Sequence, residues 1–66
     1  GGLDGLDYYR KCITIFANYK CIMIFEIGYN QSEDLIEFLQ QFKQYKYFFE
    51  VDVSNVKRIL VISSCD

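Results

Sequence analysis

The first third of the chain has the apolar periodicity of a helix. Five apolar residues recur at helical spacing and form one face: Leu6, Tyr9, Ile13, Phe16 and Ala17. Arg10 and Lys11 lie off this face. Asp4 or Asp7 can cap the helix, because an aspartate oxygen accepts the free N–H groups of a first turn. The pattern predicts that the helix ends near residues 18–20.

A near-continuous apolar run in residues 21–27 predicts a buried strand that ends at Gly28. Strands that are apolar on both faces are usually covered on both sides, as in the parallel sheets of α/β proteins. A second helix follows, which Asn30 or Ser32 can cap, and Asn30 with Glu33 has the spacing of a capping box. Its apolar face contains four residues: Leu35, Phe38, Leu39 and Phe42.

Residues 47–51 and 59–62 predict two closing strands, and the second can start at Lys57. The polar-centred connection over residues 52–56 has hairpin length. We expect the strands on either side of the second helix to be parallel and the last two to be antiparallel. The prediction is therefore one αβαββ unit over residues 1–66, of the α/β class, with a mixed parallel and antiparallel sheet.

Composition limits the function classes that fit this chain. It has 66 residues, of which 52% are hydrophobic, and a formal net charge of −2. Such a chain is too apolar for a disordered tail, and its charge does not suit a nucleic-acid-binding module. The sequence has no His, so it offers neither an imidazole base nor an imidazole metal ligand. A domain of this size buries only about 60% of its unfolded surface and is marginal without added support.

The cysteines do not supply that support. Cys12, Cys21 and Cys65 are odd in number and lack Cys-x-x-Cys spacing, which argues against a disulfide framework and a zinc site. The longest apolar run is far shorter than the roughly 20 residues of a membrane span. We therefore expect a cytoplasmic chain with no metal and no membrane or nucleic-acid partner.

Two segments of the sequence resemble the release-factor glutamine methyltransferase family. Residues 1–10 read GGLDGLDYYR, similar to the family's GGxDGLxxYR, and residues 26–31 read EIGYNQ, similar to its EIGxxQ. Residues 52–58 take the place of a weaker D-x-x-G-x-x-R segment, with Asn55 where the family has glycine. Asn tolerates positive φ, so the turn can survive. The matching positions are Gly2, Asp4, Gly5, Leu6, Tyr9, Arg10, Glu26, Ile27, Gly28, Gln31, Asp52 and Arg58.

The resemblance implies a Rossmann-like class I methyltransferase that transfers a methyl group from S-adenosylmethionine to a glutamine of a peptide chain release factor in translation termination. By analogy this chain supplies strands 5, 6 and 7, with strand 7 between the other two. The family's glycine-rich cofactor loop and its Asn-Pro-Pro-Tyr motif lie outside the matched segments. This sequence has four glycines without such a loop, and no proline. We therefore expect a C-terminal portion of the methyltransferase domain, inactive alone, with no catalytic or cofactor-binding residue of its own. Its expected partners are the N-terminal portion and, for the intact enzyme, the release factor.

Several motif residues admit both a chemical and a structural interpretation. Glu26 lies at the carboxyl end of a buried strand, where open α/β sheets place ligands. Its carboxylate can instead accept hydrogen bonds that close the strand end. Asp4 can order its loop or cap the helix. Asp52 and Arg58 are expected to form an ion pair across the hairpin connection, or to contact substrate.

A second function class also fits the sequence. The chain can be a small stand-alone α/β interaction module or a homo-oligomer without enzymatic activity. The apolar strand over residues 21–27 then presents an exposed edge, which invites pairing with another chain.

Overall fold

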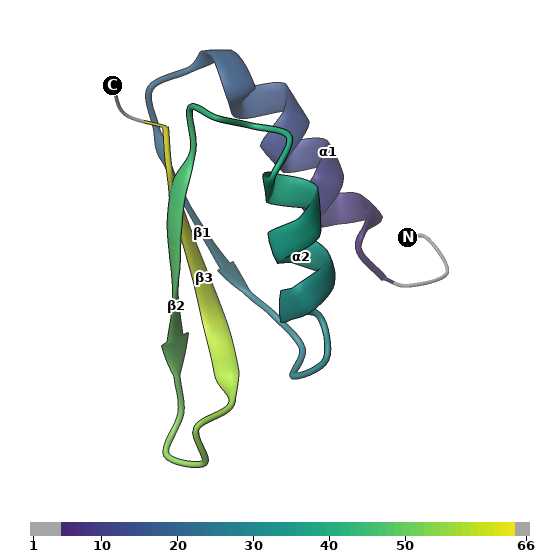
Figure 1. Ribbon diagram of the computed structural model, residues 1–66, viewed down its shortest axis with the longest axis vertical. Coiled ribbons are helices and arrows are strands. Elements are labelled where there is room, and N and C mark those ends of the chain that lie inside the picture. The colour runs from purple at the N-terminus through teal and green to yellow at the C-terminus, as the bar shows by residue number, and fades with distance from the viewer. Residues whose placement is uncertain (1–4, 65–66) are drawn as a thin grey trace.

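The computed structural model describes residues 5–64 and confirms the predicted order of elements. Gly2, Asp4 and Cys65 lie outside the described residues. The elements are α1 (Asp7–Ile15), continued by the 3-10 turn η1 (Phe16–Asn18), then β1 (Ile22–Glu26), α2 (Ser32–Leu39), β2 (Lys46–Val51) and β3 (Lys57–Ser63). Both helices lie on the same side of the sheet, and β2 and β3 form a long hairpin (Figure 1). No helix in the described range is long and apolar enough to cross a membrane.

The three strands form one sheet in the order β1-β3-β2. β3 is antiparallel to both neighbours, with Ile24 and Phe48 on either side of Val61. β1 and β2 therefore run in the same direction, as expected for strands joined through a helix, but they are not hydrogen-bonded to each other. The predicted mixed sheet is wrong for the described residues, because the last strand lies between the first two, as the resemblance implies, and both of its pairings are antiparallel.

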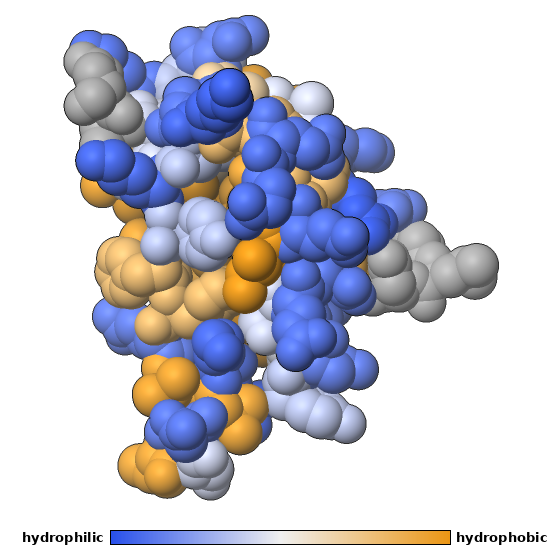
Figure 2. All heavy atoms as spheres, in the orientation of Figure 1, coloured by the Kyte–Doolittle hydropathy of each residue, from blue (hydrophilic) through white to orange (hydrophobic). Residues whose placement is uncertain are grey.

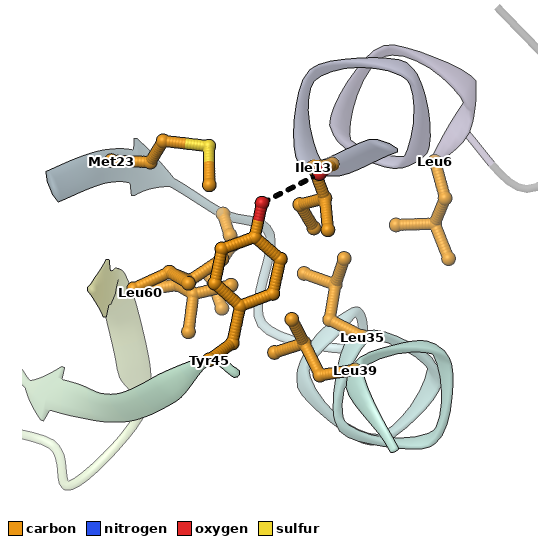
Figure 3. Packing of buried hydrophobic residues seen from close by; sticks show 9 residues of the cluster. Leu6, Ile13, Met23, Leu35, Leu39, Tyr45 and Leu60 are labelled. Carbon is orange, nitrogen blue, oxygen red and sulfur yellow. Dashed lines mark hydrogen bonds between the residues drawn. The ribbon is translucent and has the colours of Figure 1, made fainter. Parts of the chain in front are cut away.

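The core lies between the helices and the inner face of the sheet. Its buried residues come from both helices, from β1 and β3 and from the adjoining turns: Leu6, Ile13, Met23, Ile27, Leu35, Leu39, Tyr45, Leu60 and Ile62. Tyr45 stands at the centre of this cluster, between the helices and the strands (Figure 3). Its hydroxyl donates a hydrogen bond of 2.7 Å to the carbonyl oxygen of Ile13. One phenol side chain thus ties the turn before β2 to α1.

The helix starts differ from the sequence prediction. Leu6 is the N-cap of α1 and Gln31 that of α2, and neither makes a side-chain cap hydrogen bond. Asp7 and Ser32 are the first helical residues instead of caps. The carboxylate of Asp7 lies 3.4 Å from the guanidinium of Arg10. Burial of the leucine before α1 therefore takes precedence over aspartate capping.

The face of the sheet that points away from the helices is more exposed than the sequence predicts. Ile22 and Ile24 of β1 are 68% and 67% exposed, although the apolar run predicts cover on both sides. Phe16 of η1, which the helical periodicity places on the apolar face, is 40% exposed, and Phe48 of β2 is 55% exposed. The two helices cover one face only, so alternate residues of each strand point to solvent. Hydrophobic atoms gather over the β2–β3 hairpin, while the helix side is mostly hydrophilic (Figure 2).

The Tyr45 hydrogen bond provides a test of the core. Tyr45→Phe keeps the ring but leaves the Ile13 carbonyl without this donor in a buried site, so we expect about 1 kcal/mol less stability. Urea unfolding followed by circular dichroism measures the change. The matched control is Tyr29→Phe at a tyrosine that is 73% exposed. Equal unfolding midpoints for the two variants would contradict the assigned role of Tyr45.

Candidate functional site

The two motif segments meet at the carboxyl end of β1. Tyr9, from the first turn of α1, donates a hydrogen bond of 2.8 Å to the main-chain carbonyl of Glu26. Its ring also packs edge-on against Phe25, with the centroids 5.3 Å apart. The tyrosine of the first segment therefore positions the helix on the strand that leads into the second segment.

Gln31 organises the turn between β1 and α2. Its Oε1 accepts a hydrogen bond of 2.7 Å from the N–H of Gly28. Its own N–H donates to the carbonyl of Gly28 at 3.1 Å, and its carbonyl accepts from Leu35 in the first turn of α2. The glutamine thus closes the turn through its side chain and starts the helix through its main chain.

The glycines of both segments lie against this glutamine. A Cβ on Gly28 would lie 3.3 Å from Oε1 of Gln31, so even a methyl group would press on the hydrogen-bonded amide. Gly5 has φ +72°, a left-handed conformation that favours glycine. A Cβ there would lie 3.4 Å from Nε2 of Gln31. We call Gly5, Tyr9, Glu26, Gly28 and Gln31 the motif junction.

The other motif residues of these segments have different surroundings. Leu6 and Ile27 are 1% and 4% exposed and anchor the junction in the core. Arg10 lies on the surface of α1 beside Asp7. The side chain of Glu26 is on the outer face of the sheet, in the row of Ile59, and no described residue donates a hydrogen bond to its carboxylate. Of the described charged residues in these two segments, Arg10 on α1 and Glu26 on the outer face therefore lie on opposite sides of the sheet.

The third segment forms a tight turn around Asp52. Oδ1 of Asp52 accepts hydrogen bonds from the N–H groups of Ser54 and Val56, at 2.8 and 3.0 Å. Oδ2 accepts from Nε of Arg58 at 3.0 Å, which confirms the predicted ion pair. Asn55 has φ 63°, a positive φ that Asn tolerates better than most other residues.

Charge and hydrogen bonding both act on the Asp52 carboxylate. The Val56 N–H, followed by the Arg58 guanidinium, holds its pKa below the ordinary value for aspartate. The register between β2 and β3 shifts beside Glu50 and Val51, so that Val51 pairs with Lys57 and Arg58 is the extra residue. Such a bulge re-aims a side chain. Here it directs the arginine to the turn.

Two hollows of the described surface are open to solvent, and neither is lined by Gly5 or Gly28. An open groove of about 420 Å³ runs between α1 and α2, lined by Asp7, Arg10, Lys11, Thr14, Ile15 and Phe38. A hollow of about 270 Å³ lies beside Tyr29, Asn30, Ser32 and Glu33. Residues 5–64 contain no cluster of metal-ligating side chains, and Cys12 and Cys21 are free thiols. The arrangement is one of structural hydrogen bonds.

The sequence patterns do not predict that the Gln31 side chain closes the turn between β1 and α2. Gln31 was a motif position without an assigned role, and Asn30 with Glu33 had the better capping pattern. The available signal was the spacing of Gly28 and Gln31, three residues apart, which lets a glutamine side chain reach back to a strand-end N–H. The Tyr9 contact spans 17 residues and has no local signal.

The contact between Gly28 and Gln31 predicts coupled effects on stability. Gln31→Ala removes the acceptor of the Gly28 N–H and should cost about 1 kcal/mol. Gly28→Ala should destabilise the parent, because its methyl group presses on that acceptor. In the Gln31→Ala background the same change should be neutral or stabilising, since alanine restricts the unfolded chain more than glycine. Urea unfolding of the four proteins gives the coupling energy, and additive effects would contradict the contact.

The Asp52 turn predicts a specific acid dependence. Its carboxyl pKa is lower in the folded than in the unfolded chain, so its stabilisation is present above the unfolded pKa. That stabilisation is lost as pH falls below about 4 and through the folded pKa. Asp52→Asn should therefore lose less folding stability than the parent as the pH falls, which gives a flatter acid limb in a plot of stability against pH. Ser54→Ala keeps the main-chain donor and should retain the parent's acid limb. Identical acid limbs for Asp52→Asn and the parent would refute this.

Comparison with known proteins agrees with the motif resemblance. No family model and no solved structure matches the chain. Two curated proteins match, from Bacillus cereus and Bacillus anthracis, each with the name release factor glutamine methyltransferase. Each is 48% identical over 44 residues, which cover 62% of this chain and 16% of the relative. The predicted resemblance is confirmed: over most of its length this chain is similar to release factor glutamine methyltransferases.

Proposed function

We propose that this chain is the C-terminal portion of the catalytic domain of a release factor glutamine methyltransferase, and that its role there is structural. The motif junction carries the proposal. Both segments that resemble the family meet at Gln31 and at the carbonyl of Glu26, through main-chain and core contacts. Such contacts maintain the shape of a strand end and the turn after it.

The strand order supports the same assignment. The last strand lies between the other two and is antiparallel to both. The resemblance implies this arrangement for strands 5, 7 and 6 of the methyltransferase sheet. On this assignment β1 is strand 5, β2 is strand 6 and β3 is strand 7. The motif junction then lies at the carboxyl end of strand 5, the sheet edge at which ligands of open α/β sheets bind.

The residues of this chain do not fit S-adenosylmethionine by themselves. Dinucleotide-like cofactors in such folds approach the backbone of a glycine-rich turn at a helix start. Here the Gln31 side chain occupies the space beside Gly28, and the N–H of Gly28 donates a hydrogen bond to its Oε1. The groove between α1 and α2 is lined by side chains of the two helices and by none of the junction residues. The cofactor and the glutamine substrate would therefore be held by other parts of the domain.

The edge of β1 is where those other parts would join. β1 pairs with β3 on one side, and within residues 5–64 no strand pairs with its other side. An open edge can accept another strand through its free main-chain groups. The proposed partner is the remainder of the methyltransferase domain, and the intact enzyme would act on a release factor. Release factors work in translation termination, so we place the chain in the cytoplasm.

The isolated chain should neither bind S-adenosylmethionine at micromolar concentration nor transfer a methyl group. Isothermal titration with the cofactor tests the first statement, and methylation of a purified release factor tests the second. Heat of binding that saturates with a micromolar dissociation constant would defeat the structural assignment. Absence of binding alone does not establish the family role, which needs the next experiment.

A chimera tests whether this chain can perform the family's structural role. The matched stretch of the Bacillus cereus methyltransferase is replaced by the corresponding residues of this chain. We expect methyl transfer to the release factor within about tenfold of the parent enzyme, because no transferred residue touches the reacting groups. A matched chimera with Gly28→Val should lose stability and activity together. A folded chimera that binds the cofactor but transfers no methyl group would refute the proposal.

A further inference from the structure

The outer face of the sheet is a regular surface of three cross-strand rows. The central row is apolar and consists of Ile24, Val61 and Phe48. One flanking row consists of Ile22, Ser63 and Lys46, and the other of Glu26, Ile59 and Glu50. Neither helix covers these side chains, because α1 and α2 both lie on the opposite face (Figure 1). We call these nine residues the outer face.

The outer face exposes several large apolar side chains to solvent. Ile22 and Ile24 are each about two-thirds exposed, and Phe48 is 55% exposed. These residues belong to adjoining rows of one sheet, so they form a continuous patch instead of scattered contacts. Continuous apolar patches on soluble proteins mark interaction surfaces. The inner-face residues are buried beneath the two helices, so only a second binding partner could bury the outer face.

Charge is distributed unequally along this face. Lys46 lies in one flanking row, while Glu26 and Glu50 lie in the other. Lys46 and Glu50 are four residues apart on β2, a distance of about 13 Å at the rise of a strand. They are therefore too far apart to pair within one chain. The face is basic at one end of β2 and acidic at the other, with Phe48 halfway between them.

This distribution is complementary to itself. Consider a second copy packed face to face about a two-fold axis that lies across the strands, through the central row. The axis places Phe48 against Phe48 of the second copy and Lys46 against its Glu50, twice by symmetry. A two-fold axis along the strands would instead place Glu50 against Glu26 of the other copy, which is repulsive. Charge therefore selects the first arrangement.

We propose that the outer face binds a second copy of this chain, face to face, in a symmetric dimer with Lys46 of each copy paired with Glu50 of the other. The two sheets form a sandwich with an apolar centre about 10 Å thick, the spacing of packed sheets in proteins. This inference concerns the isolated chain, because an intact doubly wound domain carries helices on both faces of its sheet. It also uses a surface separate from the β1 edge.

The size of the face sets the expected affinity. Three strands at about 4.8 Å spacing and five residues at about 3.3 Å rise give a face of roughly 14 by 16 Å. That footprint, roughly 220 Å² per copy, is well below the ~800 Å² that a standard interface buries on each partner, so the dimer is a weak one. We therefore expect a dissociation constant in the micromolar range. Sedimentation velocity of the 66-residue chain from low to high micromolar concentration should show a reversible shift from monomer to dimer.

Charge reversal tests the arrangement of the two copies. Lys46→Glu places acidic groups opposite each other at both symmetric positions and should weaken dimerisation at least tenfold. The double variant Lys46→Glu with Glu50→Lys restores opposite charges and should recover the parent's dissociation constant within about threefold. Both charged side chains are exposed on β2, so the variants keep the fold, and circular dichroism checks this. A double variant as weak as the single one would overturn the arrangement.

A second pair of variants tests the apolar centre. Phe48→Lys should abolish dimerisation at micromolar concentration, whereas Val53→Lys should not affect it. Val53 is fully exposed in the turn between β2 and β3, outside the outer face. A Phe48→Lys variant that is folded and still dimeric would overturn the proposal. A parent chain that stays monomeric up to high micromolar concentration would overturn it as well.

Edge-to-edge pairing is the competing form of self-association, and amide exchange separates the two. Antiparallel pairing of two β2 edges about Phe48 would also bring Lys46 near Glu50 of the other copy. It would, however, protect the outward main-chain N–H groups of β2, and pairing through β1 would protect those of β1. Face-to-face packing leaves both sets of edge amides exchanging as fast in the dimer as in the monomer. Slowed exchange at either edge on dimerisation would refute the face-to-face arrangement.

Discussion

The structure depends on how unequally the two faces of its sheet are buried. Both faces carry apolar residues, but the two short helices pack on only one face. On the inner face, Leu60 and Ile62 of the central strand meet Ile13 of α1 and Leu35 of α2, and all four are fully buried. On the outer face, Ile22 and Ile24 remain mostly exposed. Burial of apolar surface is the main force that stabilises a fold, and small domains have little of it to spare. A chain of 66 residues with half of its sheet uncovered therefore has a strong thermodynamic reason to associate.

Hydrogen bonds determine how this limited core is held in register. Tyr45 links the turn before β2 to α1, and Tyr9 links α1 to the end of β1. Both use a phenol that packs its ring on the core and donates its hydroxyl to a main-chain carbonyl, so neither adds an unpaired polar group. Gln31 does the same for the N–H of Gly28. The residues that resemble the methyltransferase motifs thus serve to fix the end of β1 and the start of α2. Chemistry at that edge would depend on this fixed geometry, with the reacting groups supplied by other parts of a larger domain.

Local pattern and burial explain how much could be predicted from sequence. Periodicity located both helices and all three strands within one to three residues, because spacing reports which side chains share a face. The ion pair between Asp52 and Arg58 and the positive φ of Asn55 were also predictable, since they depend on residues within one turn. Periodicity does not report what covers a face. The exposure of Ile24 and Phe48 and the insertion of β3 between its neighbours were therefore beyond local reasoning. Capping by Asp7 and Ser32 failed because burial of Leu6 and the side chain of Gln31 fix those helix starts. No local pattern connects Tyr9 to the carbonyl of Glu26.

The most direct test of the uncovered outer face is the thermal midpoint of the isolated chain as a function of protein concentration. If a second copy covers that face, binding to the folded state stabilises it by mass action, and the midpoint rises as concentration increases. We predict a steady rise over a hundredfold range that spans the micromolar region. A midpoint that is the same at every concentration in that range would show that the chain is stable with the face exposed, and would contradict the account.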